Sequence, residues 1–85
     1  MTLTAELMAD IARWTACIHE RAEELDKARA ARTTAFDCYG VPSMTYRKAL
    51  VRHSLVLGAW RTAMAEREYH RERLARACEP WFWVA

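Results

Sequence analysis

The sequence predicts an all-α protein, an antiparallel hairpin of two long helices, and three observations support this fold class. The 85 residues include only two glycines and two prolines, the residues that interrupt helices, and sixteen alanines, which favour them. Large apolar residues recur three or four positions apart in two long segments. Gly40 and Pro42 lie between these segments and mark the place where the chain turns.

The first helix is expected over residues 4–38. Thr2 or Thr4 is suited to cap its start, and the acidic Glu6 and Asp10 lie in its early turns, where the helix dipole favours negative charge. Gly40 suits the left-handed position that follows a helix, and Pro42 is unable to continue one. The positions expected to line the inner face share helical spacing and are Leu7, Ile11, Trp14, Ile18, Leu25 and Ala28.

The second helix is expected over residues 44–79, after a turn at 39–43. Ser43 or Thr45 can cap it, and Pro80 ends it. Because the turn is short, the two helices are expected to be antiparallel neighbours within a single domain of residues 1–85. The second helix contributes to the core, or to a dimer contact, through Leu50, Leu57, Trp60, Met64 and Leu74.

One segment of the second helix has more apolar surface than a single neighbouring helix covers. In the stretch SLVLGAW, residues 54–60, apolar side chains point nearly all the way round the helix. Either two hairpins associate into a four-helix bundle, or a helix breaks near Thr33 or Gly58 to give shorter helices. Base rates of bundle architecture and symmetry favour the homodimer.

The segment 80–85 is rich in aromatic residues. Since the second helix returns antiparallel to the first, this tail is expected beside Leu3, Leu7 and Met8, where it would cover the open end of the hairpin. Tryptophan is also the residue most enriched where binding energy concentrates, so any ring left uncovered is a candidate partner contact. The candidate partner-binding residues, in the tail and around the turn, are Trp81, Phe82, Trp83, Tyr39, Met44 and Tyr46.

Charge is divided unevenly along the chain. Residues 1–40 carry five Lys/Arg and seven Asp/Glu, net −2, whereas residues 41–85 carry eight Lys/Arg and four Asp/Glu, net +4. The basic helix is expected to pair with the acidic one, and nucleic-acid binding is the alternative. The residues that would contact phosphates in that alternative are Arg47, Lys48, Arg52, Arg61, Arg67 and Arg71.

Catalytic and metal-binding patterns are weak. His19 and Glu23 share a helical face, but neither an HExxH nor a Glu-x-x-His motif occurs, and Cys38 has no histidine near it in sequence. His53, on the apolar stripe, is expected to be packed rather than catalytic. We therefore expect no enzyme activity, no metal and no cofactor, although a small all-α enzyme or metal-binding bundle remains an alternative.

Three cysteines without close spacing indicate reduced thiols and a cytoplasmic location. No signal peptide or transmembrane segment is expected. These features favour a small non-enzymatic regulator or inhibitor that docks on a larger host or cellular protein. Small chains of this kind are often encoded by phages or mobile elements, which is an association rather than a physical argument.

Overall fold

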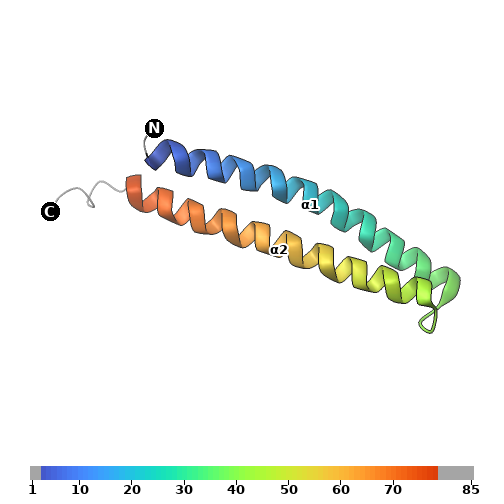
Figure 1. The fold of residues 1–85 in the computed structure, drawn as a ribbon. Coiled ribbons are helices and arrows are strands. Elements are labelled where there is room, and N and C mark those ends of the chain that lie inside the picture. The colour runs from blue at the N-terminus through green and yellow to red at the C-terminus, as the bar shows by residue number, and fades with distance from the viewer. Residues whose placement is uncertain (1–2, 79–85) are drawn as a thin grey trace.

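The computed structural model describes residues 3–78, which form two helices packed against each other as an antiparallel hairpin (Figure 1). Helix α1 spans Leu3–Tyr39 and helix α2 spans Met44–Cys78. The predicted all-α hairpin is therefore confirmed. The end of α2 lies beside the beginning of α1, as the antiparallel arrangement requires.

The turn between the helices uses the residues that the sequence singles out. Gly40 has a φ of +78°, and its amide donates to the carbonyl oxygen of Phe36 at 2.9 Å, which closes the last turn of α1. The Ser43 hydroxyl oxygen accepts hydrogen bonds from the amides of Thr45 at 3.1 Å and Tyr46 at 3.4 Å. Ser43, rather than Thr45, is therefore the residue that caps α2.

Neither helix is broken at its weak points. Helix α1 continues through Thr33, whose hydroxyl donates to the carbonyl oxygen of Arg29 at 3.1 Å, and α2 continues through Gly58. The Thr62 hydroxyl donates to the carbonyl oxygen of Gly58 at 3.0 Å. The alternative of three or four shorter helices is thus not what the chain adopts.

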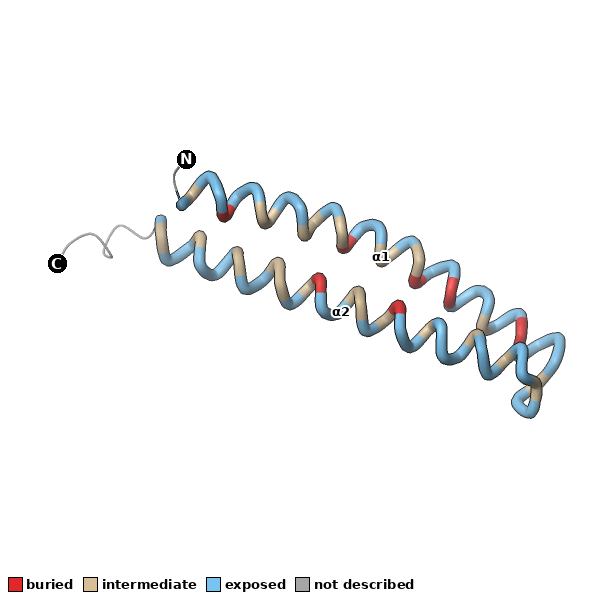
Figure 2. The backbone as a smooth tube through the Cα atoms, viewed as in Figure 1, coloured by how far each residue is buried: buried red, intermediate tan, exposed pale blue. Residues whose placement is uncertain are grey.

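The core is a narrow seam between the two helices. Figure 2 shows the buried positions on the facing sides of α1 and α2, with exposed positions on their outer sides. Three of the buried residues are alanines, and small side chains at these positions let the helix axes approach closely. The buried residues of the described chain are Leu7, Ile18, Leu25, Ala28, Ala35, Val56 and Ala63.

The inner face of α2 is centred one residue earlier than its apolar spacing suggests. Val56 and Ala63 are its buried positions, and their neighbours Leu57 and Met64 are half-buried. Leu50 remains 38% exposed. The remaining expected core positions, Ile11, Trp14, Trp60 and Leu74, are half-buried.

The molecule is a thin rod with extents of 64 × 21 × 13 Å. Its radius of gyration is 19.1 Å, whereas a compact domain of this length has one of about 12 Å. Its accessible surface is 6464 Å², against about 5,200 Å² for an ordinary folded monomer of the same mass. No helix within residues 3–78 is long and apolar enough to cross a membrane.

Candidate binding surfaces

Large apolar side chains gather at the turn end of the rod, and we call Phe36, Tyr39, Val41 and Met44 the turn cluster. Between 49% and 64% of each is exposed, with Tyr39 and Met44 the most accessible. The last turn of α1, the loop and the first turn of α2 bring them together. Such a concentration of accessible apolar surface at one end is typical of a protein-binding site.

Tyr46 supports this cluster rather than extending it. Its ring lies edge-on to that of Phe36, with centroids 5.6 Å apart and an interplanar angle of 60°. Tyr46 is half-buried, and with Phe36, Arg32 and Thr33 it lines an open hollow of about 260 Å³. Of the turn residues predicted to bind a partner, Tyr39 and Met44 are therefore the accessible ones, and Tyr46 packs against Phe36.

A second accessible surface runs along the outer side of α2, and we call it the outer seam. Its six residues alternate in steps of three and four, which places them on one face of the helix, and every one is exposed. Val51 is 59% and Leu55 68% exposed. The outer seam consists of Lys48, Val51, Leu55, Gly58, Thr62 and Ala65.

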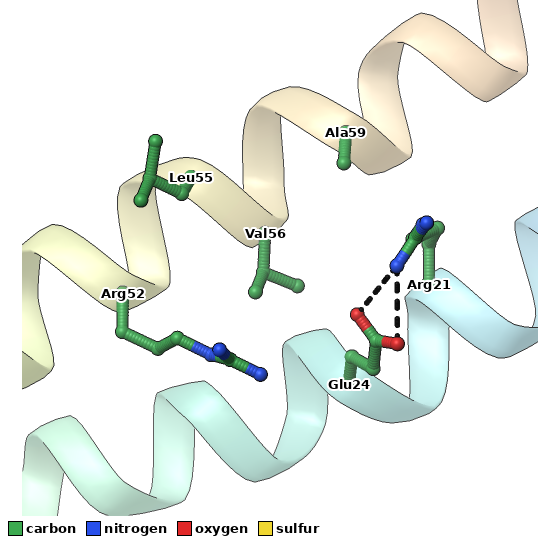
Figure 3. Close-up of a pocket in the computed structure, with 6 residues that line it drawn as sticks. All are labelled: Arg21, Glu24, Arg52, Leu55, Val56 and Ala59. Carbon is green, nitrogen blue, oxygen red and sulfur yellow. Dashed lines mark hydrogen bonds and ion pairs between the residues drawn. The ribbon is translucent and has the colours of Figure 1, made fainter.

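The inner and outer sides of α2 are distinguished clearly in Figure 3, where Val56 points toward α1 and Leu55 points away from it. The figure shows an open hollow of about 320 Å³ on the flank of the hairpin, lined also by Arg21, Glu24 and Ala59. The Glu24 carboxylate accepts two hydrogen bonds from Arg21 Nη1, at 2.9 and 3.1 Å. These hydrogen bonds, and the charge of the carboxylate, raise the pKa of the Arg21 guanidinium.

The basic side chains of α2 lie at the surface, with one exception. Arg67 is half-buried, and its Nε atom is buried without a hydrogen-bond partner. Both ion pairs in the described part of the chain, Arg13 with Asp10 and Arg21 with Glu24, lie within α1. Pairing between the acidic and basic halves is therefore not seen between the helices over residues 3–78. The exposed basic candidates are Arg47, Lys48, Arg52, Arg61 and Arg71.

The histidines and cysteines of residues 3–78 do not assemble into a metal site. No group of three or more His, Cys, Asp or Glu side chains is placed to hold an ion in that part of the chain. His53 is half-buried in the inner face, and its Nε2 atom is buried without a hydrogen-bond partner. Cys17 is half-buried, whereas Cys38 and Cys78 are exposed, and all three are free thiols.

The tail candidates Trp81, Phe82 and Trp83 lie outside the described residues. At the end of the rod where α2 finishes, Leu7 is 2% exposed, whereas Leu3 is 55% and Met8 58% exposed. The expected landing surface for the tail is thus divided between one buried and two accessible side chains.

No protein-family model, no curated protein and no solved structure matches this chain. The two accessible surfaces are therefore interpreted from their own geometry. Sequence periodicity located the inner face of α1 and came within one residue of that of α2, but it did not single out Val51 and Leu55 as a surface. The signal was present as a second run of three- and four-residue steps, from Lys48 to Ala65, offset from the inner face.

Proposed function

We propose that this protein is a small non-enzymatic regulator or inhibitor that docks on a larger protein through the turn cluster. The observation that carries the proposal is the exposure of four large apolar side chains within nine residues, 36–44, at one end of the rod. Burying one such side chain stabilises a complex by about 1.5–3 kcal/mol. A rod that presents this cluster at its tip is suited to fill a pocket on a partner.

The free thiols of Cys38 and Cys78 fit action in the cytoplasm, where thiols stay reduced. The partner is then a host or cellular protein of that compartment.

The docking proposal is tested with the turn variant Tyr39→Ser against a matched control, Tyr69→Ser. Both side chains are exposed tyrosines, 64% and 55%, but Tyr69 lies away from the turn. Affinity capture from the native host is expected to recover a partner with the wild type and the control but not with the turn variant. Loss in the control alone, or equal capture by all three proteins, contradicts docking through the turn.

We further propose that two hairpins associate into a four-helix bundle. Two helices alone bury seven residues among 3–78, and the rod exposes about 1,250 Å² more surface than an ordinary monomer of this mass. A standard protein interface buries about 800 Å² on each partner, so the excess is enough for a stable dimer. Light scattering is expected to give twice the mass of 9.9 kDa; a monomer mass at high concentration contradicts the bundle.

The tail of residues 80–85 is proposed to pack over the open end of the hairpin, in the same chain or across the dimer. The accessible Leu3 and Met8 there support this proposal. Deletion of residues 81–85 is expected to lower the melting temperature markedly. An unchanged melting temperature together with lost partner capture would instead assign the tail to the partner interface.

Nucleic-acid binding is the second candidate function, and one observation favours it. Arg47, Lys48, Arg52, Arg61 and Arg71 are exposed, and neither ion pair in the described chain involves them. A gel-shift titration at low and high salt tests this candidate, because contacts to phosphates weaken as salt rises. Absence of any shift at low salt removes it.

A further inference from the structure

The outer seam of α2 is an unpartnered helix face with the spacing of a coiled coil. Lys48, Val51, Leu55, Gly58, Thr62 and Ala65 alternate in steps of three and four, and all are exposed in the hairpin. A sustained alternation of this kind keeps one stripe facing a neighbouring helix over several turns. Leu55, one residue of this stripe, points away from α1, whereas Val56 points toward it (Figure 3).

Gly58 is unexplained by the hairpin itself. A Cβ atom built on it would meet nothing within 4 Å, so no close approach inside the molecule requires a glycine there. Glycine at a mid-helix position costs about 1 kcal/mol relative to alanine. Its neighbours along the seam, Leu55 on one side and Thr62 on the other, are exposed as well.

We infer that the outer seam binds the outer seam of a second copy of this chain, with the two α2 helices antiparallel. This inference rests on the self-association proposed above and identifies the face and the direction of the contact. The twofold axis lies between residues 56 and 57. A residue of one copy therefore faces the residue of the other copy for which the two residue numbers add up to 113. Leu55 then faces Gly58 of the second copy, Val51 faces Thr62, and Lys48 extends over Ala65.

This alignment matches a large side chain with a small one where Leu55 meets Gly58 and where Lys48 meets Ala65, while Val51 meets Thr62, a side chain of similar size. Close packing of interiors favours such alternation, because a large side chain fills the space that a small one leaves. A parallel alignment would place Leu55 against Leu55 and Gly58 against Gly58, which leaves a gap at the glycine layer. It would also set Lys48 beside Lys48, a repulsive pair.

The charges beside the seam favour the same direction. The first part of α2 carries Arg47, Lys48 and Arg52 and no acidic residue, whereas its acidic residues all lie between positions 66 and 72. In the antiparallel alignment Arg47 comes close to Glu68 of the second copy, and the twofold axis repeats the pair. Both side chains are exposed in the hairpin, so both are free to form it.

The molecule as a whole also has surplus surface. The hairpin exposes about 1,250 Å² more than an ordinary monomer of its mass, whereas a standard interface takes about 800 Å² from each partner. An open hollow of about 260 Å³ beside the seam, lined by Met44, Arg47, Lys48 and Val51, is placed to take side chains of the second copy.

Disulfide trapping tests the alignment directly. In a background with Cys17→Ala, Cys38→Ser and Cys78→Ser, the double variant Val51→Cys with Thr62→Cys is oxidised. These positions are about 16 Å apart along one helix, far beyond the roughly 7 Å limit between the Cα atoms of a disulfide. A bond between them therefore joins two chains. The single variants Val51→Cys and Thr62→Cys serve as controls. Only a parallel alignment places residue 51 beside residue 51 of the second copy and also residue 62 beside residue 62.

The expected result is a covalent dimer from the double variant and none from either single variant, while light scattering shows that the cysteine-free protein is a dimer. If the protein is a dimer but cross-links through a single variant, or does not cross-link at all, the antiparallel alignment is contradicted and the proposal of self-association is not. A cysteine-free protein that is monomeric at every concentration overturns both proposals.

A second variant checks the interface without relying on cysteine chemistry. The Cβ atom of a leucine at position 58 would meet nothing within 4 Å in its own hairpin, and leucine is a better helix former than glycine, so helix content is expected to be unchanged or higher for Gly58→Leu. Against Leu55 of the second copy the new side chain is overpacked, and the dimer dissociation constant is expected to rise roughly tenfold or more. The matched control is Ala30→Leu on the exposed side of α1. Equal dissociation constants for both variants contradict the seam.

Discussion

The two glycines of this chain show how one residue type acts in two different backbone settings. Gly40 has a φ of +78°, a conformation in which a side chain crowds the backbone, and it ends α1 through its hydrogen bond to Phe36. Gly58 lies within helix α2, where a Cβ atom would meet nothing within 4 Å. The first glycine is required by the turn, whereas the second costs the helix about 1 kcal/mol relative to alanine and meets no spatial need within the hairpin.

At this scale we predict that Gly40→Ala lowers the free energy of unfolding by about 1–2 kcal/mol, because alanine is strained in the left-handed region. Gly40→Asn is the matched control and is expected to lose less, since asparagine tolerates that conformation better. Urea denaturation monitored by circular dichroism measures both. A loss from Gly40→Ala no larger than that from Gly40→Asn would show that the turn has relaxed to another conformation.

The interface between α1 and α2 contains buried alanines, which set the distance between the two helices. Ala28, Ala35 and Ala63 are buried to 6% exposure or less, and the cluster of Leu25, Ala28 and Val56 is flanked by the half-buried Leu57 and Trp60. Larger residues at the alanine positions would force the helices apart. The packing of α1 against α2 thus depends on small side chains at the interface, whereas the exposed sides of the helices have room for larger ones.

For this element we predict that Ala28→Leu destabilises the hairpin by about 1–3 kcal/mol, because an overpacked seam displaces α2. Ala30→Leu lies two residues away on the exposed side of α1 and is expected to change stability by about 0.5 kcal/mol or less. Thermal and urea unfolding of the two variants compare the same substitution in two settings. Similar losses of stability in both variants would place Ala28 outside the interface between α1 and α2.

The whole molecule is a rod whose surface exceeds that of an ordinary monomer of its mass. The seven buried residues of the described helices form a small core. The free energy gained by packing this core must offset the large loss of conformational entropy on folding. Association of two rods along α2 would convert exposed seam residues such as Val51 and Leu55 into core. It would leave Phe36, Tyr39 and Val41 of the turn cluster outside the contact, whereas Met44 lines the hollow that would take side chains of the second copy.

At the scale of the molecule we predict that the melting temperature rises with protein concentration, because mass action favours a folded dimer over unfolded chains. Melting curves recorded by circular dichroism across a wide dilution series provide the measurement. Gly58→Leu is expected to lower the melting temperature at each concentration and to shift its concentration dependence. A melting temperature that is constant over the whole series is incompatible with folding coupled to association.

Much of the fold followed from local sequence features. The spacing of Leu7, Ile18 and Leu25 predicted α1, and Gly40 with Ser43 placed the turn between two helices whose bounds lie within a residue or two of the expected ones. These features act between near neighbours in the chain, through helix periodicity, backbone sterics and capping. They need no knowledge of the partner helix.

Which side of α2 faces α1 was decided only by the tertiary structure. Leu57 and Met64 have the larger apolar side chains of that face, yet Val56 and Ala63 are the buried positions. Val56 packs in one cluster with Leu25 and Ala28 of α1, and Leu57 lies at the edge of that cluster. The same rotation exposes Leu55 and Val51, and so creates the outer seam. The sequence by itself determined that there are two helices and where they turn, since those are properties of each segment. The faces they bury and the surfaces they leave open were decided by packing, since steric fit depends on both helices together.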